Sequence, residues 1–298
     1  MTAFDRYIDP ARSARGWWRI LIGLLFIGVC WVLGTFVVMG IWLFANWPAG
    51  AAPAEVLPSL NELAAGGSAL KSVEMRCTFA GVWVGVLVAL LVVHQQSFAS
   101  VFGPSGRQAV RQFWLGLVLA AVFAAASSLI AMTITSPVRS TVPMDTWLLW
   151  IAPLVLLIFV QATAEELIFR GYLLQQLAAR SRFFLVWGVL PSVVFGAMHF
   201  NTELPMTATI LYIATTALMG VALAVLVWRT GALWAAMGVH LGINVASLTV
   251  LGAEGILSGT QIWLFAGEHI APLLWIDTAM AGLMLVFALS PAARVFDA

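Results

Sequence analysis

Long runs of apolar residues are the feature that most constrains this chain. Eight runs are long enough, or nearly so, to cross a bilayer, which takes about 20 apolar residues in a helix. They cover residues 17–46, 77–98, 113–135, 146–180, 183–200, 206–228, 232–251 and 271–290. Only 9% of the 298 residues are charged, against roughly 25% in soluble domains. The sequence therefore predicts an all-α polytopic membrane protein with about eight transmembrane helices, in one membrane domain over residues 1–298.

The charge and the cysteine content limit which partners and sites the chain can have. The first apolar run is too long for the core of a signal peptide and does not end in a small-residue cleavage site, so we interpret it as a retained anchor. The formal net charge of +1 offers no basic patch for nucleic acid. Cys30 and Cys77 lie at unrelated positions in or beside apolar runs, which indicates neither a disulfide framework nor a thiolate metal site. The expected partner is the lipid bilayer, and nucleic acid is not.

Basic residues between the apolar runs predict the orientation of the chain. With residue 1 in the cytoplasm and strict alternation of the spans, ten basic residues fall on the cytoplasmic side. Only three, Lys71, Arg76 and Arg139, fall on the opposite side. Eight spans then place both termini in the cytoplasm.

Three charged residues, Glu165, Glu166 and Arg170, interrupt the fourth run. A charge at the centre of a membrane helix costs about 2.5–3.5 kcal/mol on insertion scales, so such residues are candidates for function. Glu166 and Arg170 are spaced i, i+4 with the carboxylate first, which favours an intrahelical ion pair. Glu165 points about 100° away around the helix and is left free to face a cavity. A purely structural ion pair would leave Glu165 unexplained.

Two further clusters carry histidines. Phe195 and His199 share one helix face in the fifth run, and His240 and Asn244 share one face in the seventh. Taken alone, His199 is better explained as an interfacial histidine at a helix end than as a catalytic residue. His240 with Asn244 is equally well explained as a polar contact between helices.

The depth of Glu165 in the membrane matches that of His199. The turn between the fourth and fifth runs lies near Ser181 and Arg182. Glu165 lies 16 residues before Ser181, and His199 lies 17 residues after Arg182. At about 1.5 Å per residue, both are about 25 Å from the tip of an antiparallel hairpin.

His240 reaches the same height only if the tip of that hairpin projects into the cytoplasm. Gln175, Gln176, Arg180 and Arg182, at or near the tip, are polar enough for such a projection. We therefore expect the three clusters to converge in the cytoplasmic half of the membrane.

A carboxylate, two imidazoles and an amide among apolar helices support two chemistries. Glu165 could act as a general base on water that His199 orients, while His240 and Asn244 donate hydrogen bonds to an oxyanion. The carboxylate and the imidazoles could instead hold a divalent metal such as zinc. The spacing is not that of HExxH, which puts both histidines on one helix. A proton path in a transporter is a third alternative, to which Asp277, expected near the outer end of the last run, could contribute.

Three motifs in this order resemble the CPBP family, which includes the type II CAAX prenyl endopeptidases and their bacterial relatives. The residues Glu165-Glu-Leu-Ile-Phe-Arg170, Phe195-Gly-Ala-Met-His199 and His240-Leu-Gly-Ile-Asn244 match EExxxR, FxxxH and HxxxN. The resemblance covers residues 146–250, with the motifs on the fourth, fifth and seventh helices. No motif residue departs from the pattern.

The resemblance implies an intramembrane endopeptidase that cleaves membrane-associated proteins or peptides. It implies that Glu165 and His199 activate water and that His240 and Asn244 stabilise the oxyanion. Glu166 and Arg170 complete the catalytic motif, and Phe195 is placed next to the substrate. The eukaryotic branch of the family removes the tripeptide after a prenylated cysteine, whereas substrates of bacterial members need not be prenylated.

The sequence leaves open in which membrane the protein lies and whether it is catalytic. Short loops and the lack of a soluble domain are typical of a prokaryotic member, so we expect a bacterial inner membrane. A non-catalytic membrane scaffold or a bacteriocin-immunity protein of the same fold is the alternative to a protease. Such a protein should tolerate replacement of Glu165.

Overall fold

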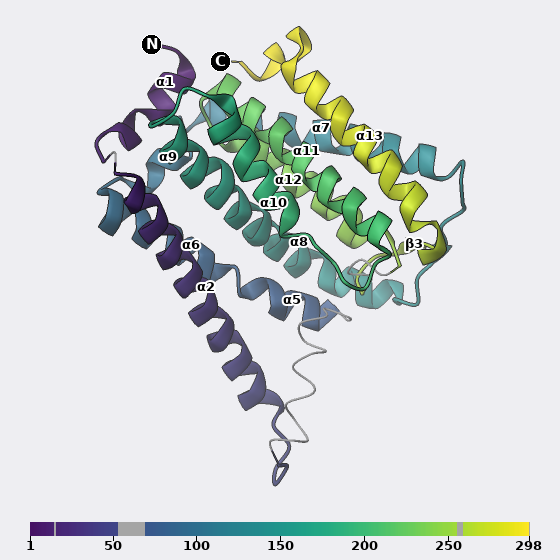
Figure 1. Cartoon of the computed structure of the whole chain (residues 1–298). Helices are drawn as coiled ribbons and strands as arrows, with labels where there is room; N and C mark the ends of the chain where they lie inside the picture. The colour runs from purple at the N-terminus through teal and green to yellow at the C-terminus, as the bar shows by residue number, and fades with distance from the viewer. Residues whose placement is uncertain (15, 53–68, 255–258, 298) are drawn as a thin grey trace.

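The computed structural model describes residues 1–14, 16–52, 69–254 and 259–297, and these ranges are almost entirely helical (Figure 1). Within them, six helices are long and apolar enough to cross a membrane. They span Trp17–Asn46, Leu70–His94, Arg107–Ala131, Met144–Ala178, Met206–Thr230 and Gly267–Leu289. Two shorter apolar helices span Leu185–Ala197 and Trp234–Val250. The prediction of an all-α, multi-pass integral membrane protein is confirmed.

Several of these spans are built from more than one helical element. The elements of the first half are α1 (Ala3–Ile8), η1 (Asp9–Arg12), α2 (Trp17–Asn46), α5 (Ala69–Cys77), α6 (Ala80–Val88), η2 (Ala89–His94), η3 (Phe98–Val101) and α7 (Arg107–Ala131). Those of the second half are α8 (Met144–Glu166), η4 (Leu167–Leu173), α9 (Leu174–Ala178), η5 (Leu185–Val189), α10 (Leu190–Ala197), α11 (Met206–Thr230), α12 (Trp234–Val245), η6 (Ala246–Val250), η7 (Gly267–His269), α13 (Ile270–Leu289) and η8 (Pro291–Phe296).

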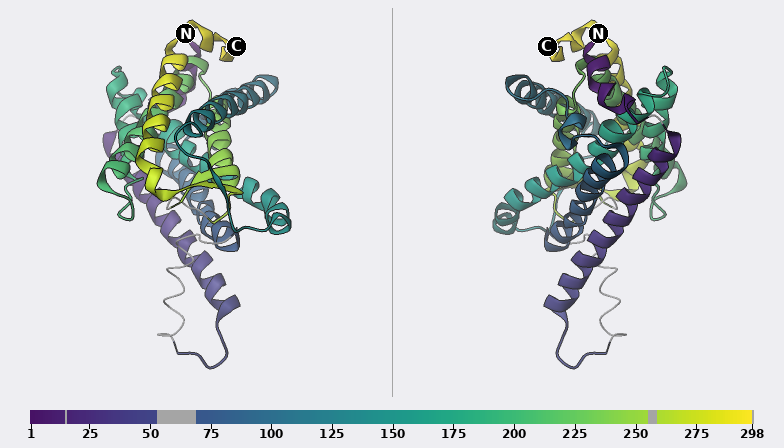
Figure 2. Two further views of the ribbon diagram at one scale, coloured as in Figure 1. Left: turned by 90° about the vertical axis from the view of Figure 1, so that its right-hand side faces the viewer. Right: turned by 90° about the vertical axis from the view of Figure 1, so that its left-hand side faces the viewer.

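Apolar side chains cover the outside of this bundle, as a bilayer requires. Helix α2 shows this most clearly, because its second half projects away from the other helices (Figures 1 and 2). Leu21, Phe36 and Phe44 on α2 are all exposed. Such a surface is stable in lipid, where no hydrophobic penalty applies, and would be a large apolar patch in water.

Helix α12 lies inside the bundle, packed against α7, α8 and α11. All residues from Ala235 to Leu241 are buried. A side chain at Gly238 would overlap the carbonyl oxygen of Phe113 on α7, and one at Gly242 would come within 2.5 Å of Cβ of Ala120. Glycine thus lets the backbones of α7 and α12 touch, which is how membrane helices pack closely. This contact fixes the position of the helix that carries His240.

The two ends of the described chain lie on the same side of the bundle (Figures 1 and 2). Arg229 at the end of α11 contacts Asp297 with an N–O distance of 3.4 Å. Arg111 on α7 donates a hydrogen bond of 2.7 Å to the carbonyl oxygen of Val295. Ends on one side agree with an even number of crossings.

Most predicted boundaries agree with the structure to within a few residues, but the second and third spans differ more. The second begins at Ala69 instead of residue 77, because the polar stretch around Arg76 is helical and packs against α8. The third runs from Arg107 to Ala131, because its polar first turns hold the C-terminal backbone. A small sheet of order β1-β3-β2 was not predicted; its strands are β1 (Val138–Arg139), β2 (Leu251–Ala253) and β3 (Trp263–Phe265).

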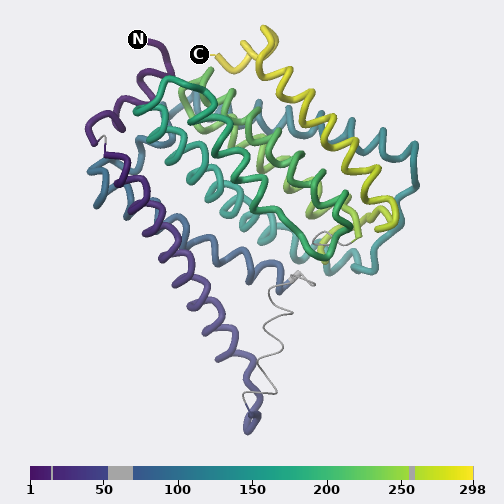
Figure 3. The backbone as a smooth tube through the Cα atoms, in the orientation of Figure 1, coloured from purple at the N-terminus to yellow at the C-terminus, as the bar shows by residue number. Residues whose placement is uncertain are grey.

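Gln175 and Gln176 do not form a solvated tip, and that part of the depth prediction is wrong. Both are fully buried. Gln175 donates a hydrogen bond of 2.7 Å to the carbonyl oxygen of Tyr7, and its carboxamide oxygen accepts one of 3.2 Å from Gln96. The N-terminal segment, α1 with η1, packs against α9 and covers this end of the hairpin (Figure 3). Gln175 therefore satisfies backbone carbonyls, Gln176 bonds the side chains of Gln96 and Arg180, and neither glutamine faces water.

Candidate active site

The candidate site lies where the chain changes from an α-helix to a π-helix. Helix α8 ends at Glu166, and the chain continues as the π-helix η4, which contains Arg170. A π-helix closes i→i+5 hydrogen bonds, and such turns are frequent at functional sites. The last turn of α8 therefore presents Glu165 and Glu166, and the wide turn that follows carries the arginine.

Glu166 contacts both Arg170 and His240. Its side chain is fully buried, and its Oε1 lies 2.8 Å from Nη1 of Arg170. The same oxygen lies 2.8 Å from Nδ1 of His240. The predicted ion pair between Glu166 and Arg170 is confirmed, and the contact with His240 is an additional one that the spacing did not predict.

His240 bridges the two adjacent carboxylates. Because the carboxylate of Glu166 is paired with Arg170 and acts as an acceptor, Nδ1 of His240 carries the hydrogen between them. The other ring nitrogen, Nε2, lies 3.4 Å from Oε2 of Glu165. The imidazole thus lies between the two carboxylates, with one ring nitrogen toward each of them. Glu166 thereby fixes the orientation and tautomer of the ring that meets Glu165.

Glu165 differs from its neighbour in exposure. Its side chain is 15% exposed, whereas that of Glu166 is not exposed at all. Its Oε1 accepts a hydrogen bond of 3.2 Å from the amide of Gln161, one turn earlier on α8. Glu165 makes no ion pair with Arg170, as the helical geometry predicted. It is the carboxylate of the pair that a water molecule or a substrate can reach.

His199 lies next to this cluster. It follows the end of α10, and its Nδ1 is 2.9 Å from the carbonyl oxygen of Phe195. The ring of Phe195 contacts the rings of His199 and His240, with centroid distances of 4.8 and 5.9 Å. One aromatic ring thus lies against both histidines, so α10 ends near the depth of Glu165. The charges of His199 and Glu165 are close enough to interact.

Phe195 is a packing residue in this arrangement. It is 2% exposed. The guanidinium of Arg170 lies 4.7 Å from the centroid of its ring, and Phe169 contacts it edge to face at 5.0 Å. A ring enclosed in this way holds the neighbouring polar side chains in place, and its burial gives no support to the predicted contact with substrate.

Asn244 lies one helical turn beyond His240 on α12 and is half-buried. Its side chain makes no hydrogen bond to any residue that the structure describes. Its amide group is therefore available, as an oxyanion donor must be. Asp277 does not join the cluster: it lies within α13, where Oδ1 accepts a hydrogen bond of 2.5 Å from Ser127 on α7.

Three residues near the site were not predicted from the sequence. Gln161 lies i−4 from Glu165, a spacing that could have identified it. Tyr212 on α11 contacts the ring of His199 edge to face at 5.4 Å. In the sequence, its hydroxyl group within an otherwise apolar run was the only feature that could have identified it. Arg76 is buried and its charge interacts with that of Glu165, although its place in the sequence suggested an outer loop.

The donor groups do not fit a metal ion well. In the ranges that the structure covers, no three His, Cys, Asp or Glu side chains are arranged to hold one. The available donors are directed at each other: His240 lies between Glu165 and Glu166, and Glu166 is also bonded to Arg170. Our mechanism therefore contains no step through a metal.

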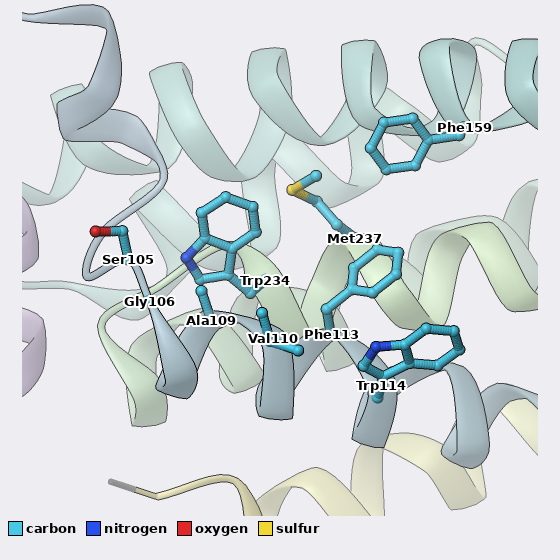
Figure 4. A pocket seen from close by; sticks show the side chains of 9 residues that line it. All are labelled: Ser105, Gly106, Ala109, Val110, Phe113, Trp114, Phe159, Trp234 and Met237. Atoms are coloured by element: carbon cyan, nitrogen blue, oxygen red, sulfur yellow. The ribbon is translucent and has the colours of Figure 1, made fainter.

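A separate apolar cavity of about 470 Å³ lies between α7, α8 and α12 (Figure 4). Nine residues line it, mainly aromatic and aliphatic ones such as Phe113, Phe159 and Trp234. None of the charged or imidazole side chains of the site lines this cavity.

Comparisons with known proteins agree with the geometry. Residues 146–246 match the family model described as Rce1-like, type II CAAX prenyl endopeptidase. A search of curated proteins found no match. The matched stretch runs from α8 to the end of α12 and contains every predicted site residue. The resemblance stated from the motifs is confirmed for this stretch.

Proposed function

We propose, on the premise that residues 146–246 are a type II CAAX prenyl endopeptidase Rce1-like domain, that the protein is an intramembrane endopeptidase. The match supports endopeptidase activity in general. The finer proposal is that Glu165 and His199 activate water to cleave membrane-associated proteins or peptides. We place the catalytic core within residues 146–250.

The reaction starts with the proton of a water molecule. Water donates one proton to Glu165, and the resulting hydroxide attacks the carbonyl carbon of the scissile bond. His199 accepts a hydrogen bond from the same water and orients it. The electron pair of the carbonyl moves onto its oxygen, which becomes the oxyanion. When the C–N bond breaks, Glu165 returns the proton to the leaving amine, so protons balance over the cycle.

The oxyanion needs hydrogen-bond donors that are already in place. The amide of Asn244 is one, because it has no partner in the described part of the chain. His240 is the second, because Nε2 is an N–H donor when the imidazole is protonated. Glu166 and Arg170 act through His240, since they fix the ring from its other nitrogen.

The observation that carries this proposal is the contact of 3.4 Å between Nε2 of His240 and Oε2 of Glu165. This contact brings the EExxxR and HxxxN motifs, which lie on two different helices, into one polar cluster, in which Glu166 and His240 are 74 residues apart in the chain. A structural ion pair alone would not place a second, partly exposed carboxylate on the far side of the imidazole. We also propose the bacterial inner membrane as the location, with both termini in the cytoplasm, on the basis of the distribution of arginine.

The test is proteolysis by the purified protein in lipid nanodiscs, with prenylated and unprenylated membrane peptides as substrates. Wild type is compared with Glu165→Gln and with Glu268→Gln, a matched control because the Glu268 side chain is 79% exposed. We expect cleavage by wild type and the control and none by Glu165→Gln. Equal cleavage by all three proteins would disprove the assignment of the base. Equal biological function without any cleavage would favour the scaffold or immunity alternative.

A further inference from the structure

The carboxylate of Glu165 has one polar neighbour at each of its oxygens. Its Oε1 accepts a hydrogen bond of 3.2 Å from the amide nitrogen of Gln161, one turn earlier on α8. Its Oε2 lies 3.4 Å from Nε2 of His240 on α12. A carboxylate oxygen has about two lone-pair sites, so these contacts leave one site on each oxygen for water. The two neighbours together set the angle of the carboxylate plane and leave it open to a reactant.

Gln161 supplies the part of this arrangement that the helix itself does not. The last torsion of a glutamate side chain is broad and has no single preferred value. Helix geometry therefore places the carboxylate of Glu165 but does not fix how its plane is turned. Glu166 is held by Arg170 and His240, whereas no arginine of the described chain forms an ion pair with Glu165. Gln161 is the residue on α8 that can hold Oε1 while Oε2 faces His240.

This contact has a cost at the other end of the Gln161 carboxamide. Its carbonyl oxygen is buried and has no hydrogen-bond partner in the part of the chain that the structure describes. The opposite orientation of the carboxamide would bring this oxygen to the carboxylate of Glu165, which only accepts hydrogen bonds when it is ionised. A buried acceptor without a partner has lost its hydration without replacement, so it lowers stability.

Other buried glutamines show how this residue type supports the fold. Gln175 and Gln176 are each bonded through both the amide and the carbonyl group. Gln112 also has a carbonyl oxygen without a partner, but its amide satisfies a buried backbone oxygen, that of Phe296. The partner of Gln161 is instead a carboxylate that is 15% exposed and can bind water without it. Gln161 therefore contributes little to the fold, and its effect falls on the site.

We propose that Gln161 is a positioning residue for the cleavage reaction: its amide turns the carboxylate of Glu165 so that one oxygen faces His240 and both oxygens remain open to water. This inference rests on the proposed function, since it adds a residue to the same site. Gln161 acts only through Glu165 and takes no part in the transfer of protons. Functional sites keep such groups at the expense of stability, so activity and stability should respond to its loss in different ways.

The experiment replaces the carboxamide with a side chain of similar size that forms no such hydrogen bond. Gln161→Met suits this purpose, because methionine is flexible and fills irregular apolar space. Gln108→Met is the matched control, since Gln108 is half-buried on α7 and its side chain makes no hydrogen bond to the described chain. We expect Gln161→Met to lower kcat about tenfold to a hundredfold, as for a misplaced catalytic group, with KM unchanged. Its midpoint of unfolding in denaturant should lie at or above that of wild type.

A third measurement does not depend on cleavage. The chain has four histidines, so the ring nitrogen signals of histidine-labelled protein in nanodiscs can be assigned by single replacements and followed by solid-state NMR. The Nε2 signal of His240 should shift in Gln161→Met, because the carboxylate that faces it is no longer held. The Nε2 signal of His94, which bonds to the hydroxyl of Tyr172 at 2.9 Å, should stay in place.

The outcomes separate this role from its alternatives. Wild-type kcat in Gln161→Met would overturn the proposal, and so would an unchanged His240 signal. A fall in stability together with the fall in rate would show that Gln161 supports the fold, and would also overturn it. Should Gln161→Met fail to fold, Gln161→Ala is measured in the same way. A wild type that cleaves nothing would refute the proposed function alone, and the His240 signal would still show whether Gln161 orients Glu165.

Discussion

His240 donates through Nδ1 to Oε1 of Glu166 over 2.8 Å, and this bond orients the imidazole toward Glu165. The same oxygen of Glu166 is bound to Arg170. The second glutamate of the pair is thus a positioning residue with two partners from different helices. The distinction between the two neighbouring carboxylates leads to different expectations for their variants.

Glu166→Gln should destabilise the fold and abolish cleavage. Removing the carboxylate leaves the guanidinium of Arg170 buried without its counter-charge, which costs about 3–5 kcal/mol. Unfolding of the purified protein in a denaturant series measures the loss. Gln161→Ala, which removes a neutral partner one turn from Glu165, is the control and should remain within about 1 kcal/mol of wild type. Wild-type stability of Glu166→Gln would contradict the central role of this residue.

Glu165→Gln should leave stability unchanged and remove activity. Its side chain is partly exposed and loses one weak contact, whereas general acid–base catalysis supplies about 10²- to 10⁴-fold in rate. Thermal unfolding and cleavage rate are measured on the same preparation. Addition of a chelator to wild type should not change the rate; loss of activity with the chelator and its recovery with zinc would show that the mechanism is wrong.

Asn244→Ala should lower kcat about 10²- to 10³-fold, the range for removal of an oxyanion donor, with little change in KM. Stability should stay the same, because the side chain has no hydrogen bond within the described structure. Ser247→Ala is a suitable control on the next turn of the same span, since its hydroxyl bonds only to backbone oxygens. Equal kcat values for Asn244→Ala and wild type would remove Asn244 from the site.

Tyr7→Phe should reduce activity although Tyr7 lies outside the matched domain. The Tyr7 hydroxyl lies 3.0 Å from the backbone oxygen of Arg170 and 2.7 Å from that of Val101. Loss of one such bond is worth about 1 kcal/mol, or roughly a fivefold change. Hydrogen exchange of residues 167–173 should increase with the fall in rate. Unchanged exchange in this segment would show that the N-terminal segment does not support the π-helix.

Gly238→Ala should destabilise the protein by about 1–3 kcal/mol, because the new methyl group overlaps the carbonyl of Phe113 on α7. Gly282→Ala on α13 is the matched control, because a methyl group there meets nothing within 4 Å. Alanine is also the better helix former, so the control should be neutral or slightly more stable. Equal stability of the two variants would mean that α7 and α12 can separate.

The helices and the local pairs of this protein could be predicted because they depend on neighbours in the sequence. Apolar runs defined the spans, and the i, i+4 spacing defined the ion pair between Glu166 and Arg170. The contact of Glu166 with His240 could not be predicted, because it depends on how α8 and α12 pack. The position of Arg76 was predicted wrongly. Its polar neighbours in the sequence indicated a loop, whereas packing against α8 makes this stretch a helix.

The hydrogen bond between Tyr7 and Arg170 joins residues 163 positions apart in the chain. At typical rates of synthesis of about 5–20 residues per second, the acceptor emerges on the order of 10–30 s after the donor. His240, which completes the cluster, emerges later still. A nascent chain in the membrane therefore has no working site until nearly all of the bundle has been made. The order of assembly therefore delays the activity proposed for this site until the bundle is nearly complete.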